Sequence, residues 1–285
     1  MSKNTFAIGA LILGSAALAF APIFVRLSDT SPAASAFWRM ALAAPLLWLW
    51  VARAPVAHTR APTPWLLLLL AGGFFAADLA ALHESILLTL IANAALELNL
   101  APVFVTLGAW LLFRQRVSRL FVAALIITLS GAAMTIGPNF YGTPKALLGD
   151  GFGVLAGLFY ACYMLTLKSV TASETTARIM AVNTTAAALL LAPYALASSG
   201  AFFPQSGTGW LILAGLAVAV QVVGQSLVAY GFAALPAQLS SVSLLLQPVF
   251  AALYAWTLLG EAMTPLQIAG GLVVLLGIYL AKRVS

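Results

Sequence analysis

The sequence predicts an all-α membrane protein with ten transmembrane helices, arranged as two inverted five-helix repeats. Hydrophobic residues make up 63% of the chain and charged residues only 7%, whereas a soluble domain carries about 25% charged residues. The apolar residues gather in runs long enough to span a bilayer, which takes about 20 residues. A segment that begins at Pro102 also has a close copy that begins at Pro248. Lipid is therefore the expected solvent for most of this chain.

Turn residues and charges divide the apolar runs into ten expected spans. The first five are Thr5–Leu27, Pro32–Val51, Trp65–Leu82, Leu88–Phe113 and Arg119–Gly137. The second five are Leu148–Lys168, Ala177–Ala197, Trp210–Leu235, Gln238–Leu259 and Pro265–Ala281. The first run has features of a signal peptide, but it continues past the candidate cleavage site at Ala19–Ala21. We therefore expect it to remain as the first span.

The basic residues predict which side each segment faces. With the N-terminus inside, the inner segments hold Lys3, Arg53, Arg60, Arg114, Arg116, Arg119, Lys168, Arg178, Lys282 and Arg283. The outer segments hold only Arg26 and Lys145. Cytoplasmic loops of membrane proteins are enriched in Lys and Arg. Both termini are therefore expected in the cytoplasm.

The copied segments stand 146 residues apart and predict an internal repeat. Identities include the pairs Pro102/Pro248, Val103/Val249, Phe104/Phe250, Leu129/Leu275 and Gly131/Gly277. We predict one repeat over residues 1–143 and a second over 144–285. Each repeat holds five spans, an odd number, so the second repeat enters the membrane in the opposite sense. Inverted repeats are typical of secondary transporters, in which the substrate binds between the two halves.

Several kinds of chemistry lack their sequence signature. The basic residues lie in connecting segments and form no face, so no nucleic-acid partner is expected. A single cysteine, Cys162, excludes a disulfide framework and a cysteine metal site. The glycines of 149–153 lack the Lys-Ser/Thr pair of a phosphate loop. We expect no metal, no cofactor and no enzymatic reaction.

Three ionisable residues stand out well inside the expected spans: Arg39, Asp78 and Glu97. Each costs about 2.5–3.5 kcal/mol at mid-membrane on insertion scales. They occupy similar depths in the outer leaflet, so we expect Arg39 to form an ion pair with Asp78 or Glu97. Two interpretations stay open, because the pair could only position helices or could contact substrate. If transport is coupled to a proton, Asp78 and Glu97 are the expected carriers.

Polar and aromatic side chains within the spans are candidates for binding a substrate. The expected substrate-binding residues are Phe20, Phe74, Asp78, Asn93, Glu97, Tyr160, Tyr163, Gln221, Gln225, Tyr230 and Gln247. An amino acid zwitterion needs hydrogen-bond donors for its carboxylate and acceptors for its ammonium, and this set supplies both. The alternative for each residue alone is an interhelical hydrogen bond or a packing contact.

Prolines interrupt three spans, at Pro22, Pro102 and Pro248. A proline inside a helix removes a backbone hydrogen bond and kinks the helix. Pro102 and Pro248 occupy equivalent places in the two repeats. We therefore expect them to act as hinges, with Pro22 acting likewise, and a static bend is the alternative.

These motifs resemble the EamA family of the drug/metabolite transporter superfamily. The resemblance rests on Gln247-Pro248-Val249-Phe250, Leu259-Gly260-Glu261, Gly270, Gly277, Phe37-Trp38-Arg39 and Leu148-Gly149-Asp150. The first repeat departs from the family pattern, because Gln115 stands where the family usually has an acidic residue. Within the family, the chain is most similar to bacterial aromatic amino acid exporters.

The resemblance implies a secondary transporter that exports amino acids or similar small metabolites across a bacterial inner membrane by alternating access. Its central cavity would be lined by spans one, three, four, six, eight and nine. A monomer or weak dimer within the lipid bilayer is expected. The alternatives are a multidrug, nucleoside or other metabolite efflux carrier, a channel-like or structural membrane protein, and an intramembrane enzyme or lipid scramblase.

Overall fold

The structure is a computed structural model that describes residues 3–54, 64–89, 91–136, 143–171, 173–260 and 262–284. Within these ranges the protein is helical and has no strand. The first half contains α1 (Lys3–Leu18), α2 (Ala21–Leu27), α3 (Pro32–Arg53), α4 (Trp65–Leu88), α5 (Ile91–Leu98), α6 (Ala101–Phe113) and α7 (Arg119–Ile136). The second half contains α8 (Pro144–Val170), α9 (Thr176–Ala197), α10 (Gly207–Gly215), the π-helix η1 (Leu216–Gln225), α11 (Ser226–Ala234), α12 (Ala237–Ser243), α13 (Leu246–Leu259) and α14 (Pro265–Val284).

Ten segments of the described chain are long and apolar enough to cross a membrane, which confirms the predicted number of spans. Most spans differ from their predicted bounds by one to three residues, and the third and sixth spans differ by more. The third span continues to Leu88, six residues beyond the predicted end, and so includes His83 and Glu84. The sixth begins at Pro144 because the Thr143 side chain accepts a hydrogen bond from the Ala146 N–H and caps the helix. Gly137, Arg60 and Glu261 lie outside the described residues.

Three of the spans are broken into two helices. The first is α1 followed by α2, the fourth is α5 followed by α6, and the ninth is α12 followed by α13. Pro22, Pro102 and Pro248 each lie in the first turn of the second helix. They therefore start a new helix, where a missing N–H is tolerated, instead of kinking a continuous one. Whether these breaks are hinges stays a prediction.

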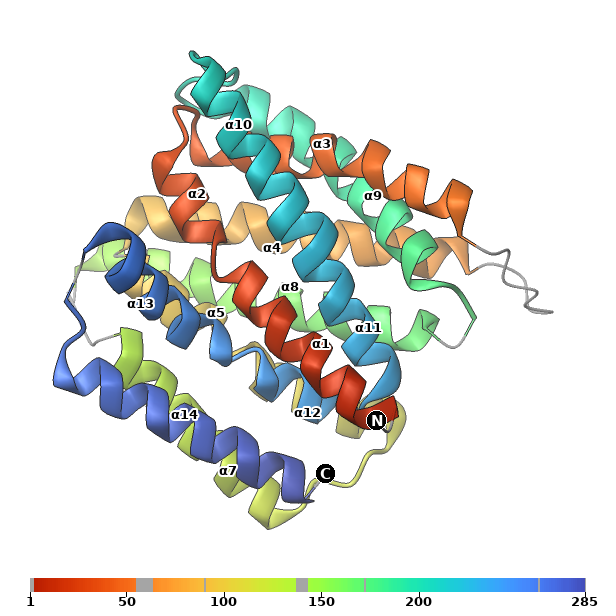
Figure 1. The fold of residues 1–285 in the computed structure, drawn as a ribbon, viewed down its shortest axis with the longest axis vertical. Helices are drawn as coiled ribbons and strands as arrows, with labels where there is room; N and C mark the ends of the chain where they lie inside the picture. The colour runs from red at the N-terminus through yellow and green to blue at the C-terminus, as the bar shows by residue number, and fades with distance from the viewer. Residues whose placement is uncertain are drawn as a thin grey trace.

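The spans pack in pairs that join the two halves of the chain (Figure 1). α3 packs against α9 and α7 against α14, so the second span meets the seventh and the fifth meets the tenth. α4 packs against α8, which pairs the third span with the sixth, and α1 packs against η1 and α11, which pairs the first with the eighth. If each span is replaced by the one five positions away along the chain, every one of these pairs becomes a pair of the same set. The pair of spans three and six, for example, becomes the pair of spans eight and one. The arrangement is that expected of two equivalent halves, while the boundary between residues 143 and 144 stays a prediction.

Glycines bring α7 and α14 into backbone contact. A Cβ atom on Gly131 would lie 2.6 Å from the backbone nitrogen of Val274, and one on Gly270 would lie 2.7 Å from the carbonyl oxygen of Gly131. Gly277 lies against Thr128 in the same way. Small residues are the usual means of close helix packing in membranes. The outer faces of this pair carry exposed apolar side chains, among them Ile126 and Leu272, which suits a position against lipid.

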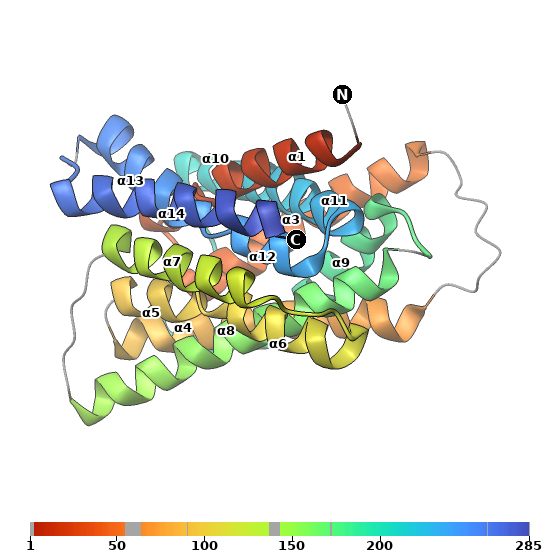
Figure 2. The same cartoon turned by 90° about the horizontal axis from the view of Figure 1, so that it is seen from below.

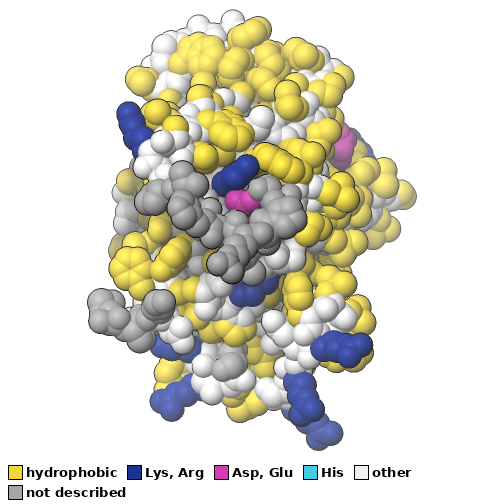
Figure 3. Space-filling model, turned by 90° about the vertical axis from the view of Figure 1, so that its right-hand side faces the viewer, with side chains coloured by type: hydrophobic (Ala, Val, Ile, Leu, Met, Phe, Trp, Pro, Cys, Tyr) yellow, Lys and Arg dark blue, Asp and Glu magenta, His cyan; other side chains and the backbone are white. Residues whose placement is uncertain are grey.

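Both chain ends point to one side of the molecule. In Figure 2, the N-terminal end of α1 and the C-terminal end of α14 face the same side as the C-terminal end of α3. We call this side the terminal end and the other side the opposite end. Figure 3 looks onto the terminal end and shows Lys and Arg side chains spread across it, with hydrophobic side chains around them.

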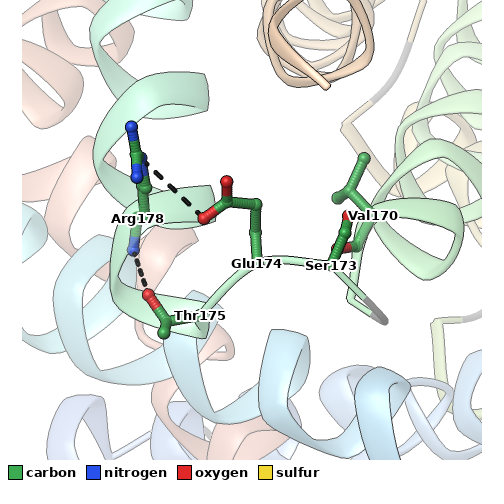
Figure 4. Close-up of polar contacts among 5 residues, drawn as sticks. All are labelled: Val170, Ser173, Glu174, Thr175 and Arg178. Atoms are coloured by element: carbon green, nitrogen blue, oxygen red, sulfur yellow. Dashed lines mark hydrogen bonds and ion pairs between the residues drawn. The ribbon is translucent and has the colours of Figure 1, made fainter. Parts of the chain in front are cut away.

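Basic side chains also tie helices together at the terminal end. The Nε atom of Arg178, at the start of α9, lies 3.8 Å from the carboxylate of Glu174, and the backbone N–H of Arg178 donates to the capping hydroxyl of Thr175 (Figure 4). Its guanidinium also stacks over the Trp65 ring of α4 at 5.1 Å. These contacts join the turn after α8 to helices from both halves.

Candidate substrate site

A buried cluster of polar and aromatic side chains lies where α3, α4, α8, α9 and η1 meet. Its members are Arg39 from α3, Phe75 and Asp78 from α4, Tyr160 and Tyr163 from α8, Asn183 and Thr184 from α9, and Gln221 and Gln225 from η1. We call this set the central cluster. Each of its side chains is at most 9% exposed.

Hydrogen bonds run through the central cluster and join three helices. The Arg39 Nε–H donates to Gln221 Oε1 at 3.0 Å, and Gln221 Nε2 donates to the Thr184 hydroxyl at 2.9 Å. Thr184 Oγ1 in turn donates to Asn183 Oδ1 at 3.2 Å. The Arg39 guanidinium carbon also lies 5.6 Å from the centre of the Phe75 ring, a cation–π distance. Arg39 therefore donates its Nε–H to Gln221, whereas its two terminal nitrogens make no hydrogen bond to the described residues of the protein.

Asp78 is the acidic member of the central cluster. It is 3% exposed, and its nearest counter-charge is Arg39, to which it is attracted electrostatically. No nitrogen–oxygen contact within 4.0 Å joins Arg39 to Asp78 or to Glu97, although all three residues are described. Glu97 lies elsewhere, beside Asp150. Two opposite charges thus lie near each other without a direct ion pair, and the expected pair stays a prediction for other states of the protein.

Aromatic rings form one wall of the cluster. Phe75 stacks on Tyr163 with ring centres 4.7 Å apart, and Tyr163 stacks on Tyr160 at 5.9 Å. Tyr160 also faces Gln225. Gln221 and Gln225 belong to the π-helix, in which hydrogen bonds join residues five apart, and both still point inward, at 0% and 2% exposure.

Four polar atoms of the central cluster are buried and have no partner within the described protein. They are Asp78 Oδ1, the Tyr163 hydroxyl, Asn183 Nδ2 and Gln225 Oε1, of which the Tyr163 hydroxyl faces Asn183 and the Gln225 amide faces Tyr160. A buried polar group left without a hydrogen bond costs about 1–3 kcal/mol, and most such groups in native proteins have one. Donors and acceptors gathered in one place therefore suit a small polar molecule that carries both kinds of group.

A second polar cluster lies between α5 and α8, toward the opposite end. The Thr89 hydroxyl donates to Asp150 Oδ1 at 2.7 Å and accepts from Asn93 Nδ2 at 3.3 Å. The Glu97 carboxylate faces that of Asp150 and lies against Gly153, where no Cβ atom is in its way. Glu97 Oε2 is buried without a partner. Two facing carboxylates in a low-dielectric site tend to share one proton.

The remaining candidates are spread over other parts of the molecule. Phe20 stacks on Tyr254 of α13 at 4.0 Å, beside the break between α1 and α2. Phe74 packs against the main hydrophobic core. Tyr230 is 39% exposed and contacts Phe6 edge-on at 6.2 Å, on the outside of α1 and α11. Gln247 lies in the first turn of α13 and is not part of either polar cluster.

The expected site residues did not include five members of these clusters: Phe75, Thr89, Asp150, Asn183 and Thr184. Phe75 stands in an unbroken apolar run, and Thr184 is an ordinary residue of a membrane helix, so neither carried a signal. Asp150 did carry one, because a carboxylate within the sixth span is as costly as Asp78 or Glu97. It was assigned only to the glycine-rich start of that span.

Comparisons with known proteins also indicate a membrane transporter. Residues 147–283 match the model of the EamA-like transporter family. An uncharacterized transporter of Archaeoglobus fulgidus is 32% identical over 197 residues, which cover 68% of each chain. The pseudopaline exporter CntI of Pseudomonas aeruginosa is 27% identical over 257 residues, which cover 90% of this chain and 88% of the exporter.

A solved crystal structure has the same fold. It superposes with a TM-score of 0.82 and covers 100% of this chain and 98% of the other, at 18% sequence identity. The likeness therefore extends to both halves of the chain, including the half that the family model does not match.

Proposed function

The chain belongs to the EamA-like transporter family, and from this premise we propose that it exports amino acids or similar small zwitterionic metabolites by alternating access. The observation that supports this most directly is the central cluster, with one cation, one anion and four unpartnered polar atoms around stacked aromatic rings. The free guanidinium nitrogens of Arg39 would bind the substrate carboxylate. Asp78 and Gln225 would accept from its ammonium, and Phe75, Tyr160 and Tyr163 would contact an apolar or aromatic side chain.

Uptake into proteoliposomes tests this substrate class. Labelled neutral, aromatic and acidic amino acids are compared with a nucleoside and a cationic drug, each with and without a pH gradient. We expect saturable transport of neutral or aromatic amino acids. Asp78→Asn and Arg39→Lys should each reduce it roughly tenfold or more, since a lost hydrogen bond to a charged group costs about 1.5–3 kcal/mol. Lysine keeps the charge of Arg39 but lacks its planar donors.

Arg116→Lys is the matched control, because Arg116 lies in the exposed segment between α6 and α7. It should transport like the unaltered protein. Movement of the nucleoside or drug alone, with no amino acid transported, would contradict the proposal. Steady single-channel current across a bilayer would also contradict it, because a carrier does not conduct through an open pore.

We further propose that the Glu97 carboxylate, which faces Asp150, carries a proton that is exchanged during transport, with Asp78 as the second carrier. The facing carboxylates and the buried, unpartnered Glu97 Oε2 support this. Glu97→Gln should abolish uphill transport driven by a pH gradient, while exchange of substrate for substrate continues. Asp78→Asn should also abolish uphill transport, and it should slow exchange because Asp78 is proposed to bind the substrate ammonium. Asp150→Asn should weaken the pH response. Unchanged uphill transport in all three variants would reject proton coupling.

A second candidate is export of another polar metabolite. It is supported by the relative named a pseudopaline exporter, which aligns over 90% of this chain. The same uptake screen separates the two candidates. For location, we propose a bacterial inner membrane with the terminal end in the cytoplasm, and a monomer or weak dimer. The Lys and Arg side chains across the terminal end support this orientation.

A further inference from the structure

The short helix α12 is closed in on all sides. All seven of its residues, Ala237–Ser243, are buried, with exposures between 0% and 6%. It packs against α1, α6, α8, α11 and α14. Figure 1 shows it beside the N-terminal end of α1, toward the terminal end of the molecule. A seven-residue helix enclosed in this way fills the space between the two halves.

The equivalent elements at the opposite end are not closed in. Under the exchange of halves, α12 corresponds to α5 and α6 to α13, so the contact between α12 and α6 should have a counterpart between α5 and α13. Within the described chain α5 and α13 are not packed together, and Figure 2 shows them well apart. Residues 247–255 of α13 and 95–98 of α5 are partly exposed. α12 and α6 therefore meet at the terminal end, whereas their counterparts α5 and α13 lie apart at the opposite end.

The side chains of α12 differ between its faces. Leu239 and Val242 pack with Phe121 and Leu125 of α7. Gln238 and Ser240 instead have buried polar atoms without a partner, as does Ser226 of the neighbouring α11. Fully buried, these atoms cost free energy, whereas in a water-filled passage they would be hydrated. The polar side chains of α12 thus suit a helix that lines a passage in another conformation.

We infer that α12 is the gate at the terminal end, and that the structure is the state closed at that end, with α5 and α13 apart at the opposite end. This inference rests on the proposed alternating access. It adds which end of the molecule is closed and which helix must move to open it. Parting α12 from α6 while α5 approaches α13 would give the inverse state, with the roles of the two halves exchanged. The substrate would then enter along the polar side chains of α12.

Cysteine labelling tests the state without any substrate. Cys162→Ala removes the native thiol, and single cysteines are added as Ser241→Cys on α12 and Tyr254→Cys on α13. Arg116→Cys and Thr208→Cys are exposed controls at the two ends. A membrane-impermeant thiosulfonate should label Tyr254→Cys nearly as fast as Thr208→Cys from the opposite end. Ser241→Cys should label at least tenfold more slowly than Arg116→Cys from the terminal end. The reverse order would overturn the assignment.

Cross-linking tests the gate itself. Val103 of α6 packs against the hydrophobic cluster that contains Val242 of α12, so α6 and α12 touch at this point. In a Val103→Cys/Val242→Cys protein, a short bifunctional thiosulfonate should abolish transport and leave Tyr254→Cys accessible, and reduction should restore transport. Either single variant should keep its transport after the same treatment. Full transport by the cross-linked protein would refute the gate, while loss of amino acid transport in the untreated protein would concern only the proposed function.

Discussion

At the scale of single residues, the central cluster depends on how one buried arginine is held. Arg39 is 8% exposed and its only hydrogen bond among the described contacts goes to Gln221. Gln221 is itself held by Thr184. The amide therefore fixes the guanidinium without neutralising it, and the terminal nitrogens keep their charge for another group.

Gln221→Leu is expected to lower the free energy of unfolding by about 1–3 kcal/mol, because it removes the partner of a buried charge. Thermal unfolding in detergent measures this as a lower Tm. Gln205→Leu, at an exposed position of the loop before α10, is the control and should leave Tm nearly unchanged. Equal Tm values for the two variants would show that Gln221 does not hold Arg39.

At the scale of helices, proline and glycine determine how the elements begin and pack. Ser31, Thr143, Thr175 and Ser206 cap helices with their side-chain oxygens, while the broken spans restart at a proline. Polar loops at the opposite end hold helix starts together, since the Asp29 carboxylate accepts from the Gln205 N–H at 3.0 Å and the Ser206 hydroxyl at 2.9 Å. Glycines give direct backbone contact between α7 and α14 and also between α4 and α9, where a Cβ atom on Gly72 would lie 2.6 Å from the carbonyl oxygen of Asn183.

Gly131→Ala and Gly277→Ala are expected to destabilise the protein by about 1–3 kcal/mol each, because an added methyl group forces the two backbones apart. A Cβ atom on Gly277 would lie 2.8 Å from the backbone nitrogen of Thr128. Gly151→Ala on α8 is the matched control, with nothing within 4 Å of its Cβ position. It should be neutral or stabilising, since alanine favours a helix over glycine. A Tm of the control below those of the other two would contradict this account of the pair.

At the scale of the whole molecule, hydropathy and proline positions were enough to predict ten spans, because lipid requires each span to satisfy its own backbone. The positions of the breaks at Pro22, Pro102 and Pro248 could be predicted from sequence. Their form could not, since the same residue pattern is compatible with a kinked helix and with the start of a new one. The candidate site was harder to predict. Gln221, Gln225, Tyr160 and Tyr163 do lie in one cluster, whereas Tyr230 faces outward, because helix rotation depends on neighbours that no local pattern reveals.

Lys168 of α8 ties this helix to the end of α11. Its ammonium donates to the carbonyl oxygens of Phe232 and Leu235 at 2.7 and 2.8 Å, at the C-terminal end of α11. A lysine that binds the last carbonyl oxygens of a neighbouring helix joins α8 to α11 at the terminal end. When α12 parts from α6, we therefore expect α8 and α11 to keep this contact and to move together.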